Sequence, residues 1–211
     1  MIEFQTDVRT PDGKMDCFVC HPDNQARPAI LFYMDIPGIR EELRDMCRHI
    51  AKQGYVVILP DLYYREGVVR FDLSKGDSEM KKMFAMGSKI TVDMVVRDTK
   101  GMIEYCRNED FIADGIGCIG YCMSGQFVVA AAGNFPEDIR AAASLYGVRI
   151  VTDQPDSPHL LSDKIKAELY LGFAEHDPFV EDHVIPDLRA ALDSAKINYV
   201  LESHADPEHG L

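Results

Sequence analysis

The most informative segment of this chain is Cys118-Ile119-Gly120-Tyr121-Cys122-Met123-Ser124-Gly125. Two small residues, Gly120 and Ser124, stand two positions on either side of Cys122. A nucleophile on a tight turn between a strand and a helix needs such neighbours, because larger side chains would clash with the strained backbone. Residues 115–119 predict a short buried strand before the turn, and residues 126–132 predict a helix after it. The segment therefore predicts that Cys122 is a nucleophile on a strand-to-helix turn.

Other interpretations of this segment are weaker. The dinucleotide-binding spacing G-x-G-x-x-G is satisfied by Gly115, Gly117 and Gly120. That motif should follow a strand and open a helix, whereas these glycines lie inside the predicted strand. Ser124 is a less suitable nucleophile, because the position two residues after it is the bulky Gln126. Cys122 as a buried structural thiol is the remaining alternative, since free cysteine is among the most buried residue types.

The composition indicates one domain. A chain of 211 residues with 46% hydrophobic content can bury one sizeable core, and no change in composition marks a second domain. We therefore expect a single domain over residues 1–211. The net charge of −13 and the isoelectric point near 4.9 argue against binding to nucleic acid or to an anionic membrane.

Features of targeting and redox chemistry favour the cytoplasm. The chain opens with no basic and apolar leader, and no apolar run is long enough to cross a bilayer. The six cysteines do not follow the spacing of a disulfide scaffold, which is typical of a reducing compartment. The pair Cys17-x-x-Cys20 lies on a predicted strand without a second pair, so a zinc site there is not expected.

Strand and helix patterns alternate along the chain. The predicted strands cover residues 29–34, 55–59, 115–119, 141–146, 168–173 and 197–202. Helical patterns begin at Ile39, on both sides of Gly87, after the Cys122 turn and at Val184. This order predicts an α/β protein with a largely parallel central sheet and helices on both faces, as in the α/β-hydrolase fold. The carboxyl ends of the strands should meet at one edge, where functional residues collect.

A nucleophilic thiol needs a base and a third group that orients the base. In the α/β-hydrolase fold these residues follow the order nucleophile, acid, histidine. Asp177 and Glu175 lie on the loop after the predicted strand 168–173. We prefer Asp177, because Pro178 favours an extended conformation for it, although an ordinary Asx turn also explains an aspartate there.

Two histidines follow the last predicted strand. His209 is preferred over His204 as the base, because Gly210 allows a tight backbone turn beside it. His204, Asp206 and His209 together suggest a metal site, but no matching cluster occurs elsewhere in the sequence. We expect neither a metal nor a cofactor.

Several segments of the chain, in the same order, resemble sequences of the dienelactone hydrolase family. They are Met34-Asp35-Ile36-Pro37-Gly38, Pro60-Asp61-Leu62-Tyr63, Gly120-Tyr121-Cys122-Met123-Ser124-Gly125, Tyr146-Gly147-Val148, Asp177-Pro178-Phe179-Val180 and His209-Gly210. The resemblance runs from about residue 29 to the end and implies a Cys–His–Asp triad of Cys122, His209 and Asp177. It also implies that the resting thiol contacts an acidic side chain at the position of Asp35.

The resemblance further implies an oxyanion hole formed by the backbone N–H groups of Ile36 and Met123. Two departures from the family limit what can be transferred. The dienelactone-opening member has Glu at the position of Asp35, one methylene longer. It also holds its substrate carboxylate with arginines, one of them beyond the position of Leu211, where this chain ends without the family's terminal helix.

The arginines Arg65 and Arg149 are the remaining candidates for a substrate carboxylate, although we expect both at the solvated surface. The leading prediction is a cysteine hydrolase of small esters or lactones, of the carboxymethylenebutenolidase type, acting as a monomer or small homo-oligomer. One alternative is a non-catalytic relative in which Cys122 is a redox-sensitive thiol. The other is a nucleotide-binding oxidoreductase, which depends on the glycine triplet alone.

Overall fold

The computed structural model describes residues 1–205 and divides the chain into two compact units, Met1–Ile116 and Gly117–Leu211. The strands are hydrogen-bonded in the order β1-β2-β4-β3-β5-β6-β7-β8. Strand β5 (Ile112–Tyr121) runs from the first unit into the second. The single domain over residues 1–211 stays a prediction.

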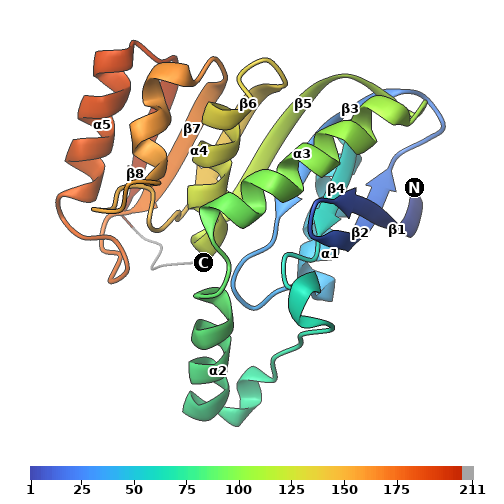
Figure 1. Cartoon of the computed structure of the whole chain (residues 1–211), viewed down its shortest axis with the longest axis horizontal. Helices are drawn as coiled ribbons and strands as arrows, with labels where there is room; N and C mark the ends of the chain where they lie inside the picture. The colour runs from blue at the N-terminus through green and yellow to red at the C-terminus, as the bar shows by residue number, and fades with distance from the viewer. Residues whose placement is uncertain (206–211) are drawn as a thin grey trace. The chain divides into compact units, whose positions relative to one another are not determined.

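The first unit combines an antiparallel hairpin with a parallel pair of strands (Figure 1). Its strands are β1 (Ile2–Thr10), β2 (Gly13–His21), β3 (Arg27–Tyr33) and β4 (Val56–Pro60). Strand β2 pairs with β4 antiparallel, and β3 pairs with β4 parallel. All five residues of β4 are buried, as expected for a strand covered on both faces.

Three helices belong to the first unit, together with two short 3-10 turns. They are α1 (Glu41–Ala51), α2 (Asp77–Gly87), α3 (Val92–Asn108), η1 (Tyr64–Glu66) and η2 (Leu73–Lys75). The α1 helix buries residues at a spacing of four, Leu43, Cys47 and Ala51, which keeps them on one face. The α3 helix begins after Thr91, whose side chain accepts a hydrogen bond from the Met94 N–H at 3.2 Å.

Within residues 117–205, the second unit contains three parallel strands and two helices besides the end of β5. They are β6 (Ile139–Leu145), β7 (Glu168–Ala174), β8 (Tyr199–His204), α4 (Gly125–Asn134) and α5 (Val184–Ala195), with the 3-10 segments η3 (Cys122–Ser124) and η4 (Pro158–Lys164). Strand β6 pairs with β7 and β7 with β8, both parallel. The α4 helix lies beside β6 in Figure 1, and every residue of it except Asn134 is buried. A helix that is buried on all sides packs inside the protein, which explains why most residues of α4 are apolar.

These elements confirm the predicted α/β class and its largely parallel sheet. Each predicted strand and helix lies within a few residues of the observed one. The glycines of the dinucleotide-binding spacing lie within β5, as predicted, and do not form a loop before a helix.

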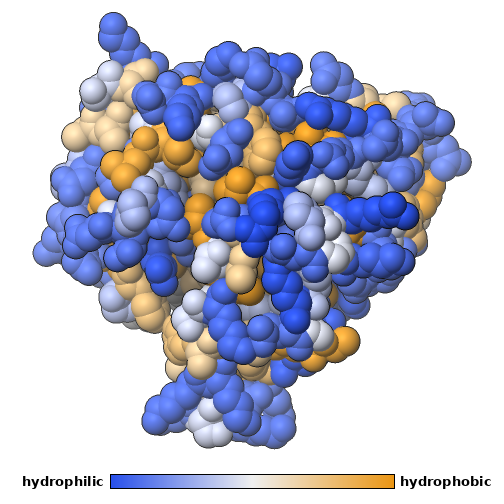
Figure 2. All heavy atoms as spheres, viewed as in Figure 1, coloured by the Kyte–Doolittle hydropathy of each residue, from blue (hydrophilic) through white to orange (hydrophobic). Residues whose placement is uncertain are grey.

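The face in Figure 2 is covered mostly by hydrophilic residues, in line with the high content of charged side chains. No helix among residues 1–205 has the length and apolar character that a membrane span requires.

Candidate active site

The predicted strand-to-helix turn is present at Cys122. Strand β5 ends at Tyr121, η3 begins at Cys122, and α4 begins at Gly125. Cys122 has φ +51°, a conformation that non-glycine residues rarely adopt outside special sites. A Cβ atom on Gly120 would lie 2.8 Å from the Ser124 carbonyl oxygen, so only glycine fits there. This contact confirms the requirement for a small residue at Gly120.

The loop after β6 supports the turn. A Cβ atom on Gly125 would lie 2.2 Å from the Gly147 Cα and 2.5 Å from the Ser144 Oγ, so the two backbones pack directly. The Val148 N–H donates to the Cys122 carbonyl oxygen at 3.1 Å. This packing holds Cys122 in its strained conformation.

Met123 follows Cys122 and is buried, and the Gln126 side chain donates to its carbonyl oxygen at 3.0 Å. Gln126 is itself buried in the first turn of α4. The backbone around Met123 is therefore fixed at the amino end of a helix, where the helix dipole favours negative charge.

Cys122 is also the most accessible thiol. All six cysteines lie within the described residues, and the other five are buried, whereas Cys122 is partly exposed. Burial raises the pKa of Cys20 and Cys106 to about 12, and raises the pKa of Cys17, Cys47 and Cys118 as well. Thiols with such pKa values are poor nucleophiles at neutral pH, because the thiolate is the reactive form.

The loop after β7 carries both candidate acids. The Phe179 N–H donates to the Asp177 Oδ1 at 2.9 Å, and the Val180 N–H donates to the Asp177 carbonyl oxygen at 3.1 Å. This is the Asx turn that was the alternative explanation for Asp177. The Glu175 side chain is exposed.

Hydrogen bonds join the loops at the carboxyl ends of the strands in the second unit. The Tyr146 N–H after β6 donates to the Gly172 carbonyl oxygen in β7 at 2.8 Å. The Glu175 N–H after β7 donates to the His204 carbonyl oxygen at the end of β8 at 2.9 Å. Together with the Val148 bond to Cys122, these contacts place the Cys122 turn, the Asp177 loop and the last residue of β8 at one edge.

The two histidine candidates have different outcomes. His204 is the last residue of β8, partly exposed, with its Nε2 3.9 Å from the Glu202 Oε2. His209 and Asp206 lie outside the described residues, so the role of His209 stays a prediction. Within residues 1–205, no three His, Cys, Asp or Glu side chains are grouped as a metal ion would require.

In the first unit, residues 35–38 form a tight turn after β3. The Gly38 N–H donates to the Asp35 carbonyl oxygen at 3.0 Å, and Gly38 has φ +81°. Arg40 donates to both Asp35 carboxylate oxygens, at 2.5 and 2.7 Å, and this contact raises the pKa of Arg40. The predicted contact between Asp35 and the resting thiol stays a prediction, and Arg40 is a partner that no sequence signal indicated.

The outcomes for Arg65 and Arg149 differ. Arg149 is exposed, as predicted. The prediction for Arg65 is wrong, because its side chain is only 14% exposed and forms ion pairs with Asp12 and Asp98.

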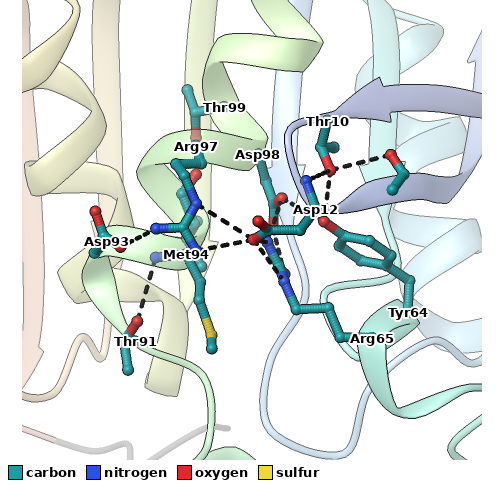
Figure 3. A network of polar contacts seen from close by, with 12 residues as sticks. Thr10, Asp12, Tyr64, Arg65, Thr91, Asp93, Met94, Arg97, Asp98 and Thr99 are labelled. Carbon is teal, nitrogen blue, oxygen red and sulfur yellow. Dashed lines mark hydrogen bonds and ion pairs between the residues drawn. The ribbon is translucent and has the colours of Figure 1, made fainter.

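Figure 3 shows this group of ion pairs, which joins the turn between β1 and β2, through Asp12, to η1 and α3. Arg65 donates two hydrogen bonds to the fully buried Asp98, at 2.9 and 2.8 Å, and the Tyr64 hydroxyl donates a third at 2.8 Å. Arg97 reaches Asp12 from α3 at 2.8 Å. Arg65 therefore stabilises the first unit internally.

Comparisons with known proteins identify relatives of this chain. The model of the dienelactone hydrolase family matches residues 15–211. A candidate carboxymethylenebutenolidase of Synechocystis sp. is 26% identical over 189 residues, which cover 87% of this chain and 75% of the relative. The carboxymethylenebutenolidase of Pseudomonas putida is 24% identical over 172 residues, which cover 80% and 70%.

Solved structures share the fold. A candidate dienelactone hydrolase from Klebsiella pneumoniae has a TM-score of 0.86 at 21% identity, covering 99% of this chain and 87% of that one. A dienelactone hydrolase-like promiscuous phosphotriesterase from metagenomic libraries has a TM-score of 0.79 at 12% identity, covering 100% and 84%. The fold is that of the α/β-hydrolases, and the protein is a hydrolase that acts on ester bonds. With nearly the whole sequence matched by the family model, the chain belongs to the dienelactone hydrolase family.

Proposed function

We propose that this protein hydrolyses small carboxylic esters or lactones by acyl transfer to Cys122, with His209 as base and Asp177 orienting that base. The observation that carries the proposal is the Cys122 turn. Its φ of +51°, its glycine-only neighbour Gly120 and its partial exposure are what a nucleophile at the end of a strand requires.

The proposed reaction begins with proton transfer from the Cys122 thiol to His209. The thiolate attacks the ester carbonyl carbon, and the carbonyl π electrons move to oxygen. The backbone N–H groups of Ile36 and Met123 donate to this oxyanion. One donor of this kind contributes about 3 kcal/mol to the stability of the transition state. The fixed backbone at Met123 supports this role, since a donor is most effective when it is oriented before the reaction.

Collapse of the tetrahedral intermediate breaks the bond to the leaving alcohol, which takes the proton from His209. The product is a thioester on Cys122. Water then attacks the thioester carbonyl while His209 accepts a proton, and collapse releases the acid and regenerates the thiol. For a lactone, the alcohol and the acid are parts of one product.

The carboxylate at Asp177 would orient His209 and stabilise its protonated form. In support, the Glu175 N–H bond to the His204 carbonyl joins the Asp177 loop to the end of β8, the element that precedes His209 in the sequence. The substrate class is supported by the names of the relatives in Synechocystis sp. and Pseudomonas putida.

The test uses Cys122→Ala beside Cys118→Ala on a panel of aryl esters and lactones. Cys118 is buried four residues earlier in β5, so it controls for the loss of a thiol in the same segment. We expect Cys122→Ala to lose at least about 1,000-fold in kcat, since the nucleophile is removed, while Cys118→Ala remains active.

Retention of activity in Cys122→Ala to within tenfold of the parent would refute the proposal. Rapid alkylation of Cys122 in a parent that turns over no ester or lactone would instead favour the redox-sensitive thiol.

A further inference from the structure

The turn at residues 35–38 is held in place by more than its own hydrogen bond. Ile36 is the residue whose N–H group is proposed to donate to the oxyanion, so the orientation of its backbone matters for the reaction. On one side of Ile36, the Asp35 carbonyl accepts from the Gly38 N–H and the Asp35 carboxylate is held by Arg40. The Ile36 carbonyl, on the other side, needs a donor of its own.

That donor is Tyr63, which follows β4. Its side chain is fully buried, and its hydroxyl donates to the Ile36 carbonyl oxygen at 2.6 Å. The ring lies against Gly38, where an added Cβ would be 3.2 Å from the ring Cε2. The ring of Phe71 packs edge-on against the Tyr63 ring at a centroid distance of 6.1 Å. The hydroxyl therefore has little freedom to leave the Ile36 carbonyl.

The backbone of Tyr63 is fixed as well. Its N–H donates at 3.0 Å to the carboxylate of Asp61, a residue that is itself buried. The peptide group that carries the Ile36 N–H is thus held by the Gly38 bond to the Asp35 carbonyl, and the next peptide group is held by the Tyr63 bond to the Ile36 carbonyl.

We infer that Tyr63 is a positioning residue whose hydroxyl fixes the Ile36 backbone, and with it the N–H group to which the proposed function assigns the oxyanion. The inference rests on the proposed function. It assigns a supporting role to a side chain, whereas the proposed oxyanion hole consists of backbone N–H groups alone. Tyr63 acts through Ile36 and does not touch the reacting atoms in this role.

Tyr63→Phe tests the inference, and Tyr64→Phe is the matched control. Both substitutions remove one phenolic hydroxyl from adjacent positions. The Tyr64 hydroxyl donates to Asp98 at 2.8 Å and lies 2.7 Å from the Thr10 Oγ1, so its bonds do not involve Ile36 (Figure 3). Turnover is measured on phenyl acetate and on its thiono analogue, whose sulfur is a weak hydrogen-bond acceptor. The rate of Cys122 alkylation by iodoacetamide reports on the thiol without any oxyanion.

For Tyr63→Phe we expect kcat on phenyl acetate to fall about tenfold, the effect of losing one well-placed hydrogen bond. The KM and the alkylation rate should stay within about twofold, since hydrogen bonds made in the transition state alone affect kcat. The loss on the thiono ester should be smaller than on the ester, whereas Tyr64→Phe should keep the parental kcat. If Tyr63→Phe does not fold, Phe71→Leu removes the ring that packs edge-on against Tyr63 and should give a smaller loss with the same selectivity.

Equal losses on ester and thiono ester, or the same loss of kcat in Tyr64→Phe, would overturn the inference. If the parent turns over phenyl acetate and Tyr63→Phe is fully active, the role of Tyr63 is overturned while the proposed function still holds. A parent without turnover of any ester overturns both.

Discussion

Replacing Arg65 by methionine would leave a carboxylate buried without its cation. Asp98 is fully buried, and Arg65 is 14% exposed. The pair is bidentate, with N–O distances of 2.9 and 2.8 Å. Removing one partner of a buried ion pair costs roughly 3–5 kcal/mol in the free energy of unfolding, because the other charge stays buried. We expect a loss of this size for Arg65→Met at pH 8.

The loss should depend on pH. Burial raises the pKa of Asp98 even with Arg65 present, and removal of Arg65 should raise it further. The unfolded chain loses the same proton near pH 3.9. Between these two pKa values the folded state binds more protons than the unfolded state, so stability falls as the pH rises through that window. Arg65→Met should therefore be less destabilised at pH 5 than at pH 8.

Asp12, the second partner of Arg65, affects stability over a different pH range. The hydrogen bond from Arg97 lowers the pKa of Asp12 most, and the bond from Arg65 lowers it further. The stability that Asp12 contributes is therefore present above the ordinary pKa of an aspartate and is lost as the pH falls through the lowered pKa. Arg97→Met is the matched control, because Arg97 binds the same Asp12 from a position that is 34% exposed. Its loss in the free energy of unfolding should be much smaller than that of Arg65→Met, because solvent screens an exposed ion pair.

The assay is urea unfolding of the parent and both variants at pH 5 and pH 8. Equal losses for Arg65→Met at the two pH values would refute the assignment of a buried, uncompensated Asp98. A loss in Arg97→Met as large as in Arg65→Met would refute the distinction between the buried and the surface pair.

Gly125→Ala should abolish folding, because its Cβ would lie 2.2 Å from the Gly147 Cα; a native circular dichroism spectrum and urea midpoint would contradict this packing. Ser144→Ala should be as stable as the parent or up to about 1 kcal/mol more stable in urea, because the buried hydroxyl has no hydrogen-bond partner within residues 1–205; a loss above that amount would show a missed partner. Asp177→Asn should lower kcat at least about 100-fold, since an amide does not stabilise a protonated histidine. An asparagine oxygen still accepts from the Phe179 N–H, so the Asx turn remains in this variant. Unchanged kcat would therefore mean that Asp177 forms the turn and takes no part in the reaction.

The parts of the structure that follow from local sterics were predictable. The turn at Cys122 was identified because Gly120 and Ser124 satisfy a spacing that the backbone itself demands, and the structure shows the close contact behind it. The buried strand β4 was identified because its residues are apolar without interruption.

Strand β1 was not predicted, although its positions alternate between less and more exposed residues, as in a half-buried strand. Its place comes from pairing with β2 along its whole length. The Asp12-Gly13 pair between the two strands is the sequence signal that could have identified this hairpin.

Contacts over long sequence separations also escaped prediction. Arg65 was expected in solvent because an arginine on a polar connection usually is, and its partner Asp98 lies 33 residues away on α3. The hydroxyl of Tyr63 meets Ile36 across 27 residues. The sequence contains the residues of such pairs, but no spacing rule joins them.

In the proposed reaction, Cys122 carries the acyl group. Rapid mixing with 4-nitrophenyl acetate, quenching in acid and peptide mass analysis detect this intermediate. We expect an acetyl group on Cys122 that forms in the first turnover, decays at the steady-state rate and is absent from Cys122→Ala. Steady turnover without any adduct, or with the acetyl group on another residue, would contradict it.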